Sequence, residues 1–254
     1  TGARPPETLG WGGIHFGQVY GSLAYNMMMA LRAAPGLPVL STEAGYTAAT
    51  VSEATQAAYD ERETLYAYSC GVSMTWLYDL LDDSQAYGLA RLDGSLRPAA
   101  YGMQGLLHIL ADPAPAPAPC TLDATISTLP SVAYQSLLLC KKSGEKDLVL
   151  WQSAPIQDPN TGTALPVVQA TLSVTVPARS GQTIVYQQYP TYRWSYFPAI
   201  PGSPITVKLN ERPLIIAFGA SAIPALPALP ILGTGLAPNG QPIPPPNGKG
   251  SSLN

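Results

Sequence analysis

The sequence predicts an α/β segment followed by an all-β segment, and the order of patterns along the chain indicates this. Residues 1–111 alternate helical patterns with short apolar runs, whereas residues 121–219 show period-two alternation broken by turn residues. An alternating Ala-Pro stretch at residues 112–120 separates the two as an extended, semi-rigid linker. Residues 220–254 are rich in Pro, Gly, Asn and Ser, which predicts a weakly ordered tail. The 254 residues suffice for one large or two modest domains.

Helical patterns recur within residues 1–111. The first covers about residues 15–34, where apolar side chains recur at three- and four-residue steps in Phe16, Val19, Leu23, Met27 and Leu31. A second helix runs to about residue 68 and can be capped by Ser52 or Thr50. A third begins at Pro98, because proline is favoured at the first helical position, and continues to Leu110.

Short apolar runs at residues 37–41 and 70–77 predict two strands of a sheet with both faces buried. Since helices lie between and after these strands, we expect them to be parallel neighbours. Two strands cannot close a barrel, which needs ~8, so further strands are expected upstream. In the second segment, short antiparallel strands predict a β-sandwich at residues 132–140, 147–151, 167–176, 183–187, 205–209 and 214–218.

Composition excludes several classes of function. Charged residues make up 11% of the chain, the net charge is −3, and no basic stretch occurs, so nucleic acid is not expected as a partner. The most apolar stretch, residues 214–238, is interrupted by Pro224, Pro227 and Pro230, so no membrane span is predicted. The chain opens at Thr1 without a visible signal peptide, and we expect a processed or fragmentary chain.

The cysteines are Cys70, Cys120 and Cys140, none of them in CxxC spacing. This excludes a zinc knuckle or a thioredoxin motif. A Cys120–Cys140 disulfide in an exported protein is one interpretation, and three buried thiols without a function are the other.

The string PVLSTEAGY at residues 38–46 contains the strongest candidate for chemistry. A buried strand delivers Thr42 and Glu43 at its C-terminal end, and Gly45 then lets the chain turn. Reacting groups of barrel enzymes lie at the C-terminal ends of strands, so Glu43 is a candidate catalytic carboxylate. The alternative is a glutamate that caps the next helix or forms a salt bridge in the loop.

A second string supports the catalytic interpretation. The strand ending in Trp76 and Tyr78 is followed by an acidic loop and then by YGLARLDGSLRPAAY at residues 87–101. With TEAGY at residues 42–46, this order resembles the clan A glycoside hydrolases, especially the β-xylosidase-like family thirty-nine and its endoglycosidase relatives. The resemblance covers about residues 37–107. The matching residues are Thr42, Glu43, Gly45, Tyr46, Trp76, Tyr78, Asp79, Gly88, Leu89, Asp93, Gly94, Arg97, Pro98, Ala99 and Tyr101.

The resemblance implies that residues 1–111 are the C-terminal portion of a (β/α)8 TIM barrel, beginning after its sixth strand. An antiparallel β-sandwich accessory domain would follow at residues 121–219. Glu43 would be the nucleophile of a retaining enzyme, and no metal or organic cofactor is implied, because two carboxylates suffice. The substrate would be a β-linked oligo- or polysaccharide.

Further residues are implied as substrate ligands. Trp76 would stack on the apolar face of a sugar ring, the alternative being packing inside the barrel. Tyr78 and Asp79 would lie near the substrate, or would serve structure only. Tyr46 belongs to the same motif as the nucleophile. His15 would face the catalytic end of an intact barrel, or would simply cap the first helix.

The acid/base of the family pattern, a glutamate after an asparagine, has no counterpart here. Asn210-Glu211 is a turn between two predicted strands, and Glu7, Glu53, Glu61 and Glu63 lack a strand-end setting. We therefore expect the acid/base on a missing N-terminal barrel segment, since a retaining glycosidase needs two carboxylates about 5–5.5 Å apart.

Two functions from different classes remain open. The first is the C-terminal part of a secreted or periplasmic retaining glycoside hydrolase. The second is a non-catalytic carbohydrate-binding or structural module derived from such an enzyme. The aromatic string at residues 186–197 fits either a sugar-binding platform or a loop that packs the β-domain onto the barrel.

Overall fold

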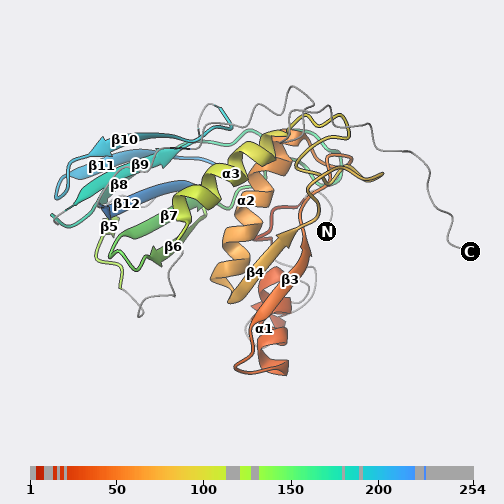
Figure 1. Cartoon of the computed structure of the whole chain (residues 1–254), viewed down its shortest axis with the longest axis horizontal. Coiled ribbons are helices and arrows are strands. Elements are labelled where there is room, and N and C mark those ends of the chain that lie inside the picture. The colour runs from red at the N-terminus through yellow and green to blue at the C-terminus, as the bar shows by residue number, and fades with distance from the viewer. Residues whose placement is uncertain are drawn as a thin grey trace, which may run out of the picture.

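The computed structural model describes residues 4–8, 14–15, 18–19, 22–112, 121–126, 132–178, 181–188, 191–220 and 226. Two antiparallel sheets lie at one side of the molecule, a pair of helices lies in the middle, and a parallel strand pair lies beyond the helices (Figure 1). None of the helices in these residues combines the length and the apolar character needed to cross a bilayer.

The parallel strand pair confirms the order predicted for the first segment. Strand β3, Val39–Ala44, pairs in parallel with β4, Val72–Leu77, and the helix α2, Glu53–Ser69, connects them. Ser52 caps α2, because its Oγ accepts the Thr55 N–H at 3.1 Å. Helix α3, Pro98–Leu110, follows β4 and begins at proline as predicted. No barrel closure is observed, since β3 and β4 form a sheet of their own within the described residues.

The first predicted helix begins later than its apolar spacing indicated. Helix α1 covers Leu23–Ala33, whereas β1, Ile14–His15, and β2, Gln18–Val19, form an antiparallel pair ahead of it. The start is set by Ser22, whose backbone is extended and whose Oγ accepts the Tyr25 N–H at 3.0 Å. The chain carries glycines at positions 17 and 21, and glycine costs about 1 kcal/mol in a helix, which opposes an earlier start. Phe16 lies outside the described residues.

The second segment is antiparallel throughout, as predicted. A five-stranded sheet has the order β10-β9-β12-β7-β6, and a three-stranded sheet has the order β11-β8-β5. The strands are β5 Thr125–Ile126, β6 Tyr134–Cys140, β7 Lys146–Gln152, β8 Ala170–Thr175, β9 Gln182–Gln187, β10 Ser195–Ala199, β11 Pro204–Leu209 and β12 Leu214–Ala220. Strands β5 and β10 were not predicted, and β10 begins within the aromatic string.

The two sheets face each other across an apolar core. Strand β11 alternates exposed and buried side chains, and its buried residues Ile205, Val207 and Leu209 meet the five-stranded sheet. Leu148 and Leu150 of β7 enter this core from the other side. One face of the five-stranded sheet is therefore covered by the three-stranded sheet.

Helices α2 and α3 cover the opposite face of the five-stranded sheet. Leu65, Met103 and Leu106 from the helices share a cluster with Val149 and Trp151 of β7. Consequently β7 is buried on both faces, which explains its unbroken apolar run.

The aromatic string contributes to this helix–sheet contact. Trp194 is buried in the same cluster, and its Nε1 donates to the Gly102 carbonyl of α3 at 2.8 Å. A Cβ at Gly105 would lie 2.0 Å from the Trp194 ring, so glycine is needed for this approach. Tyr186 is buried as well, whereas Tyr196 and Phe197 of β10 are exposed. Part of the string thus packs the sheet against α3.

Helix α2 carries charged side chains into the interior because it is covered on two sides. Asp60, Glu61 and Arg62 are all buried. The Arg62 guanidinium pairs with Glu7, and the Trp151 Nε1 donates to the same carboxylate at 2.6 Å. The N-terminal segment is thereby tied to both α2 and the five-stranded sheet. A buried pair of this kind is costly to break, because removing one partner leaves an uncompensated charge.

Of the cysteines, Cys140 is disulfide-bonded and Cys70 is a free thiol. Cys120, the partner that the sequence suggests for Cys140, lies outside the described residues.

Candidate functional site

The C-terminal end of β3 is bulged where it carries Glu43. Ser41 pairs with Thr75 and Ala44 pairs with Leu77, so that Thr42 and Glu43 together stand opposite Trp76. Such a bulge re-aims side chains and is frequent next to active sites. The side chains of Thr42 and Glu43 are both exposed.

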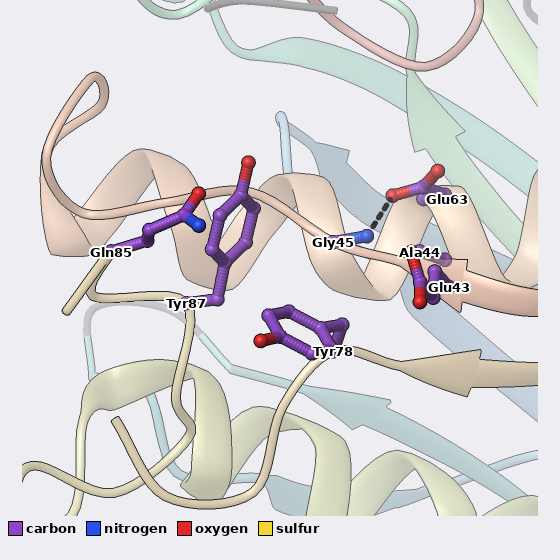
Figure 2. Close-up of a pocket in the computed structure, with 7 residues that line it drawn as sticks. All are labelled: Glu43, Ala44, Gly45, Glu63, Tyr78, Gln85 and Tyr87. Carbon is purple, nitrogen blue, oxygen red and sulfur yellow. Dashed lines mark hydrogen bonds between the residues drawn. The ribbon is translucent and has the colours of Figure 1, made fainter. Parts of the chain in front are cut away.

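A pocket of about 420 Å³ opens beside this strand end. Its lining includes the side chains of Glu43, Glu63, Tyr78, Gln85 and Tyr87 (Figure 2). Glu43 comes from β3, Glu63 from α2, and the other three from the loop that leaves β4. Two carboxylates and two phenols in one pocket can bind hydroxyl-rich ligands and can exchange protons with them.

Polar side chains of α2 hold the backbone just after Glu43. The Gly45 N–H donates to Glu63 Oε2 at 3.0 Å, and the Tyr46 N–H donates to Asp60 Oδ1 at 3.0 Å. The Gln56 Nε2 donates to the Tyr46 carbonyl at 2.8 Å. The turn that follows the candidate nucleophile is therefore bound by the helix behind it.

Burial changes the acidity of these two helix carboxyls. It raises the pKa of Glu63 to about 6, while the hydrogen bond from Gly45 acts in the opposite direction. Burial also raises the pKa of Asp60, and the nearby charge of Glu63 adds to this increase. Glu63 thus titrates within the range in which a carboxyl can act as an acid.

Gly45 is required where β3 turns toward α2. Its φ is +129°, and an added Cβ would lie 3.0 Å from the Tyr78 carbonyl oxygen. The Tyr78 N–H in turn donates to the Ala44 carbonyl at 2.7 Å. In Figure 2 the backbone at Gly45 lies between Glu63 and Tyr78. The ends of the two strands are therefore fastened to each other.

Tyr78 and Asp79 begin the loop after β4, and the peptide bond between them is cis. The Tyr78 hydroxyl donates to Asp83 Oδ2 at 2.8 Å, and this hydrogen bond raises the pKa of Tyr78. The Tyr78 ring meets Tyr87 edge to face, with centroids 5.6 Å apart. Asp79 Oδ1 is buried without a hydrogen-bond partner among the described residues, and its desolvation raises the pKa of Asp79.

Trp76 lies on the face of β4 that points away from the helices. It is 56% exposed, and its Nε1 donates to the Met74 sulfur at 2.7 Å. Leu40 of β3, which pairs with Met74, is exposed on the same face. An exposed indole beside Glu43 is a surface on which a sugar ring can stack.

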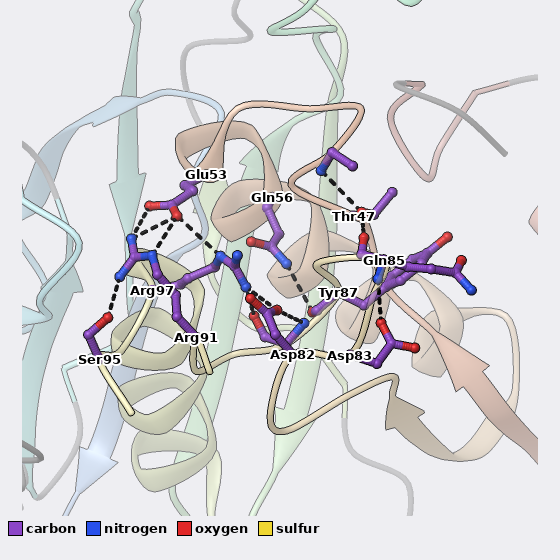
Figure 3. Close-up of polar contacts among 12 residues, drawn as sticks. Thr47, Glu53, Gln56, Asp82, Asp83, Gln85, Tyr87, Arg91, Ser95 and Arg97 are labelled. Atoms are coloured by element: carbon purple, nitrogen blue, oxygen red, sulfur yellow. Dashed lines mark hydrogen bonds and ion pairs between the residues drawn. The ribbon is translucent and has the colours of Figure 1, made fainter. Parts of the chain in front are cut away.

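The remainder of the loop is held by ion pairs (Figure 3). Glu53 at the start of α2 bonds both Arg91 and Arg97, and Arg97 also pairs with Asp82. The Arg97 Nη1 donates to the Gly88 carbonyl at 2.8 Å, and Arg97 lowers the pKa of Asp82. Several residues of the sequence motif therefore shape the loop rather than line the pocket.

The structure brings together some of the predicted site residues. Glu43 and Tyr78 line the pocket, and Trp76 stands opposite Glu43 on the neighbouring strand. Tyr46 is 5% exposed, and its hydroxyl donates to the Arg4 carbonyl at 2.8 Å, so it lies in the core. His15 lies in β1, and its side chain is outside the description.

Sequence reasoning missed Glu63 as a pocket residue. Glu63 does not follow a strand, but α2 packs behind β3 and β4 and presents it to the strand end. The three-residue spacing of Asp60 and Glu63 places both on one face of the helix, which was the available indication. Gln85 and Tyr87 enter the pocket because the loop folds back over it.

Comparisons with known proteins bear on the fold. No protein-family model matches the chain, and no curated protein matches it. Among solved structures, the chain is similar to a family 39 glycoside hydrolase from the gut symbiont Bacteroides cellulosilyticus WH2, with a TM-score of 0.55 and 17% identity. The match covers 84% of this chain and 41% of that protein. At this identity the likeness is one of fold.

Proposed function

We propose that this chain is part of a retaining glycoside hydrolase that acts on a β-linked oligo- or polysaccharide, with Glu43 as its nucleophile. The observation that carries the proposal is the placement of Glu43. It stands in a bulge at the C-terminal end of a parallel strand, opposite an exposed tryptophan and on the wall of a pocket. Reacting groups of barrel enzymes occupy this position. The fold likeness to a family 39 glycoside hydrolase supports the same conclusion.

The proposed chemistry uses the side chains at this strand end. The Glu43 carboxylate attacks the anomeric carbon and forms a glycosyl-enzyme intermediate, and the glycosidic oxygen leaves with a proton from a second carboxylic acid. Water then hydrolyses the intermediate. Trp76 stacks on the apolar face of the sugar, and Tyr78 lies beside Glu43 in the pocket. No metal or organic cofactor takes part.

The strand pair would complete a (β/α)8 barrel together with an N-terminal segment. Leu40, Met74 and Trp76 form an exposed face on β3 and β4, and neither strand has a second neighbour among the described residues. Exposed apolar faces and open sheet edges commonly indicate a contact surface. Residues 121–219 would be an accessory β-sandwich, with 112–120 as the linker and 220–254 as the tail.

One observation favours the alternative, a non-catalytic carbohydrate-binding module. The second carboxylate in the pocket, Glu63, accepts the Gly45 N–H and lies on a helix behind the strand. One of its two oxygens is therefore occupied by the backbone. Without an acid from another segment, the pocket would bind sugar without cleaving it.

Covalent trapping separates the two functions. The full chain is incubated with 2-fluoro glycosides carrying a good leaving group, and the labelled peptide is identified by mass spectrometry. These reagents need no acid catalyst, so Glu43 should be labelled even where the acid/base is absent. Glu43→Gln is the control and should remain unlabelled. Labelling of another carboxylate, or sugar binding without any labelling, would contradict the nucleophile assignment.

We also propose that the protein is secreted or periplasmic. The disulfide at Cys140 supports this, because disulfides persist in oxidising compartments.

A further inference from the structure

A second pocket, of about 530 Å³, lies away from Glu43. It is formed where the N-terminus of α2 meets the loop before β8 and the turn between β11 and β12. Ser52 and Thr55 line it from the helix, and Tyr192 and Arg212 line it from the sheet side. Leu165 and Val167 add an apolar wall. The volume suits a ligand the size of one or two sugar rings.

Arg212 is the unusual group in this pocket. It is 8% exposed, and its guanidinium stacks over the Tyr192 ring at 4.2 Å from the centroid. Among the described residues its side chain bonds a neutral amide, since Nη1 donates to Gln188 Oε1 at 3.1 Å. A guanidinium has five N–H donors, so this arrangement leaves a planar fork available to a ligand in the pocket.

The charge of Arg212 is only partly balanced within the protein. Gln188 separates it from Glu61, because Gln188 Nε2 donates to both Glu61 oxygens at 2.9 Å. Burial raises the pKa of Glu61 to about 7, and the charge of Arg212 acts in the opposite direction. Glu61 does not line the pocket, whereas the acid Glu211 does.

We propose that this second pocket binds the carboxylate of an acidic sugar. The Arg212 fork would hold the carboxylate, because planar bidentate pairing with carboxylates is the geometry that arginine favours. The N-terminus of α2 adds a partial positive charge at the same place. Tyr192 and the apolar wall would contact the ring, and Glu211 would accept its hydroxyl groups. The sugar part of this ligand rests on the proposed function, whereas the carboxylate part rests on Arg212 and the N-terminus of α2.

Glucuronate and glucose provide a direct test, because they share a ring and differ in the carboxylate. Binding to the full chain is measured by calorimetry, with acetate as a carboxylate without a ring. We expect glucuronate to bind about tenfold or more tightly than either, since hydrogen bonds to charged groups are the strong ones. Equal binding of glucuronate and glucose, or no binding of glucuronate, would overturn the proposal. Acetate binding as tightly as glucuronate would overturn its sugar part.

Two sets of variants locate the site. Arg212→Gln should reduce glucuronate affinity about tenfold, and Arg193→Gln, on a residue outside this pocket, should leave it unchanged. Because Arg212 is buried and its loss could unfold the protein, Ala54→Glu provides an independent measurement. Ala54 is exposed on the pocket wall in the first turn of α2, where an acidic residue is compatible with the helix.

Ala54→Glu should weaken glucuronate binding several-fold by repulsion, and the matched Ala54→Gln should not. Equal effects of these two substitutions would exclude a charge-dependent site. Glu43 labelling does not involve this pocket, so the two proposals can fail separately. If Glu43 is not labelled but glucuronate is still preferred over glucose, only the proposed glycosidase function fails.

Discussion

The five-stranded sheet and the parallel strand pair bury their apolar side chains to different degrees. The sheet is covered on one face by three strands and on the other by α2 and α3, so its central strands are buried on both sides. The β3–β4 pair contacts helices on one face only, and Leu40, Met74 and Trp76 are exposed on the other. The two regions share α2, which lies between them in Figure 1. The covered region supplies the stability, and the open region carries the candidate chemistry.

The largest expected effect is in the open region. If Glu43 is the nucleophile, Glu43→Gln keeps its shape and removes the charge that stabilises an oxocarbenium-like transition state. We expect the activation free energy for an activated aryl glycoside to rise by several kcal/mol. Each ~1.4 kcal/mol corresponds to a tenfold decrease in kcat. Steady-state kinetics measure this, and the melting temperature should stay within a few degrees of wild type.

Chemical rescue adds a control for the same position. Azide should restore turnover to Glu43→Ala by entering the vacated space, and the product should have inverted anomeric configuration. Wild-type activity of Glu43→Gln would show that Glu43 is not the nucleophile.

The covered region should give the next largest effect. Leu106 of α3 is 1% exposed against the sheet, whereas its neighbour Leu107 is 60% exposed. Leu106→Ala should therefore lower the free energy of unfolding by about 2–5 kcal/mol. Leu107→Ala, measured by the same urea denaturation, should change it by less than about 0.5 kcal/mol. Equal losses would mean that the α3 contact with the sheet is not the one described.

Glu63 lies on α2, between the two regions, and should have a smaller, pH-dependent effect on the free energy of unfolding. Because the folded-state pKa of Glu63 is raised to about 6, the native protein binds more protons than the unfolded chain between its ordinary pKa and that value. The stability that Glu63 contributes should decline as pH rises through this window and level off above it. Glu63→Gln should remove about 2 kcal/mol of that decline. The unfolding free energies of wild type and Glu63→Gln are measured from pH 4 to pH 7. Identical pH profiles of the two proteins would show that Glu63 is not responsible.

The smallest effect on stability is expected on the open face itself. Met74 is 48% exposed, so Met74→Ser should change the unfolding free energy by less than about 0.5 kcal/mol. It should instead reduce concentration-dependent self-association, measured by sedimentation velocity, because exposed apolar faces promote contacts. A loss of stability like that of Leu106→Ala would show that the face is covered in solution.

Local patterns predicted much of this fold. The capping of α2 by Ser52, the proline start of α3, and the parallel pairing of β3 with β4 all follow from nearest-neighbour chemistry. Helix α1 begins later than the apolar spacing predicted. The Ser22 cap and the preceding glycines set its start, and the spacing of apolar residues does not register either of them. Strand β10 was missed because its aromatic residues fitted a loop or hairpin equally well.

The sequence by itself determined where the chain alternates between strand and helix, and that Glu43 lies at the C-terminal end of a strand. The expected burial of both faces of that strand was wrong, because Leu40 is exposed on one of them. Periodicity and capping are properties of neighbouring residues, so they can be read without a partner. Only the tertiary structure decided that Glu63 enters the pocket, that Tyr46 lies in the core, and that Arg212 faces a second pocket. The physical reason is that burial of a polar side chain depends on what packs against it from a distant part of the chain. Residues 61 and 188 illustrate this, since Glu61 meets Gln188 only because the sheet folds onto α2.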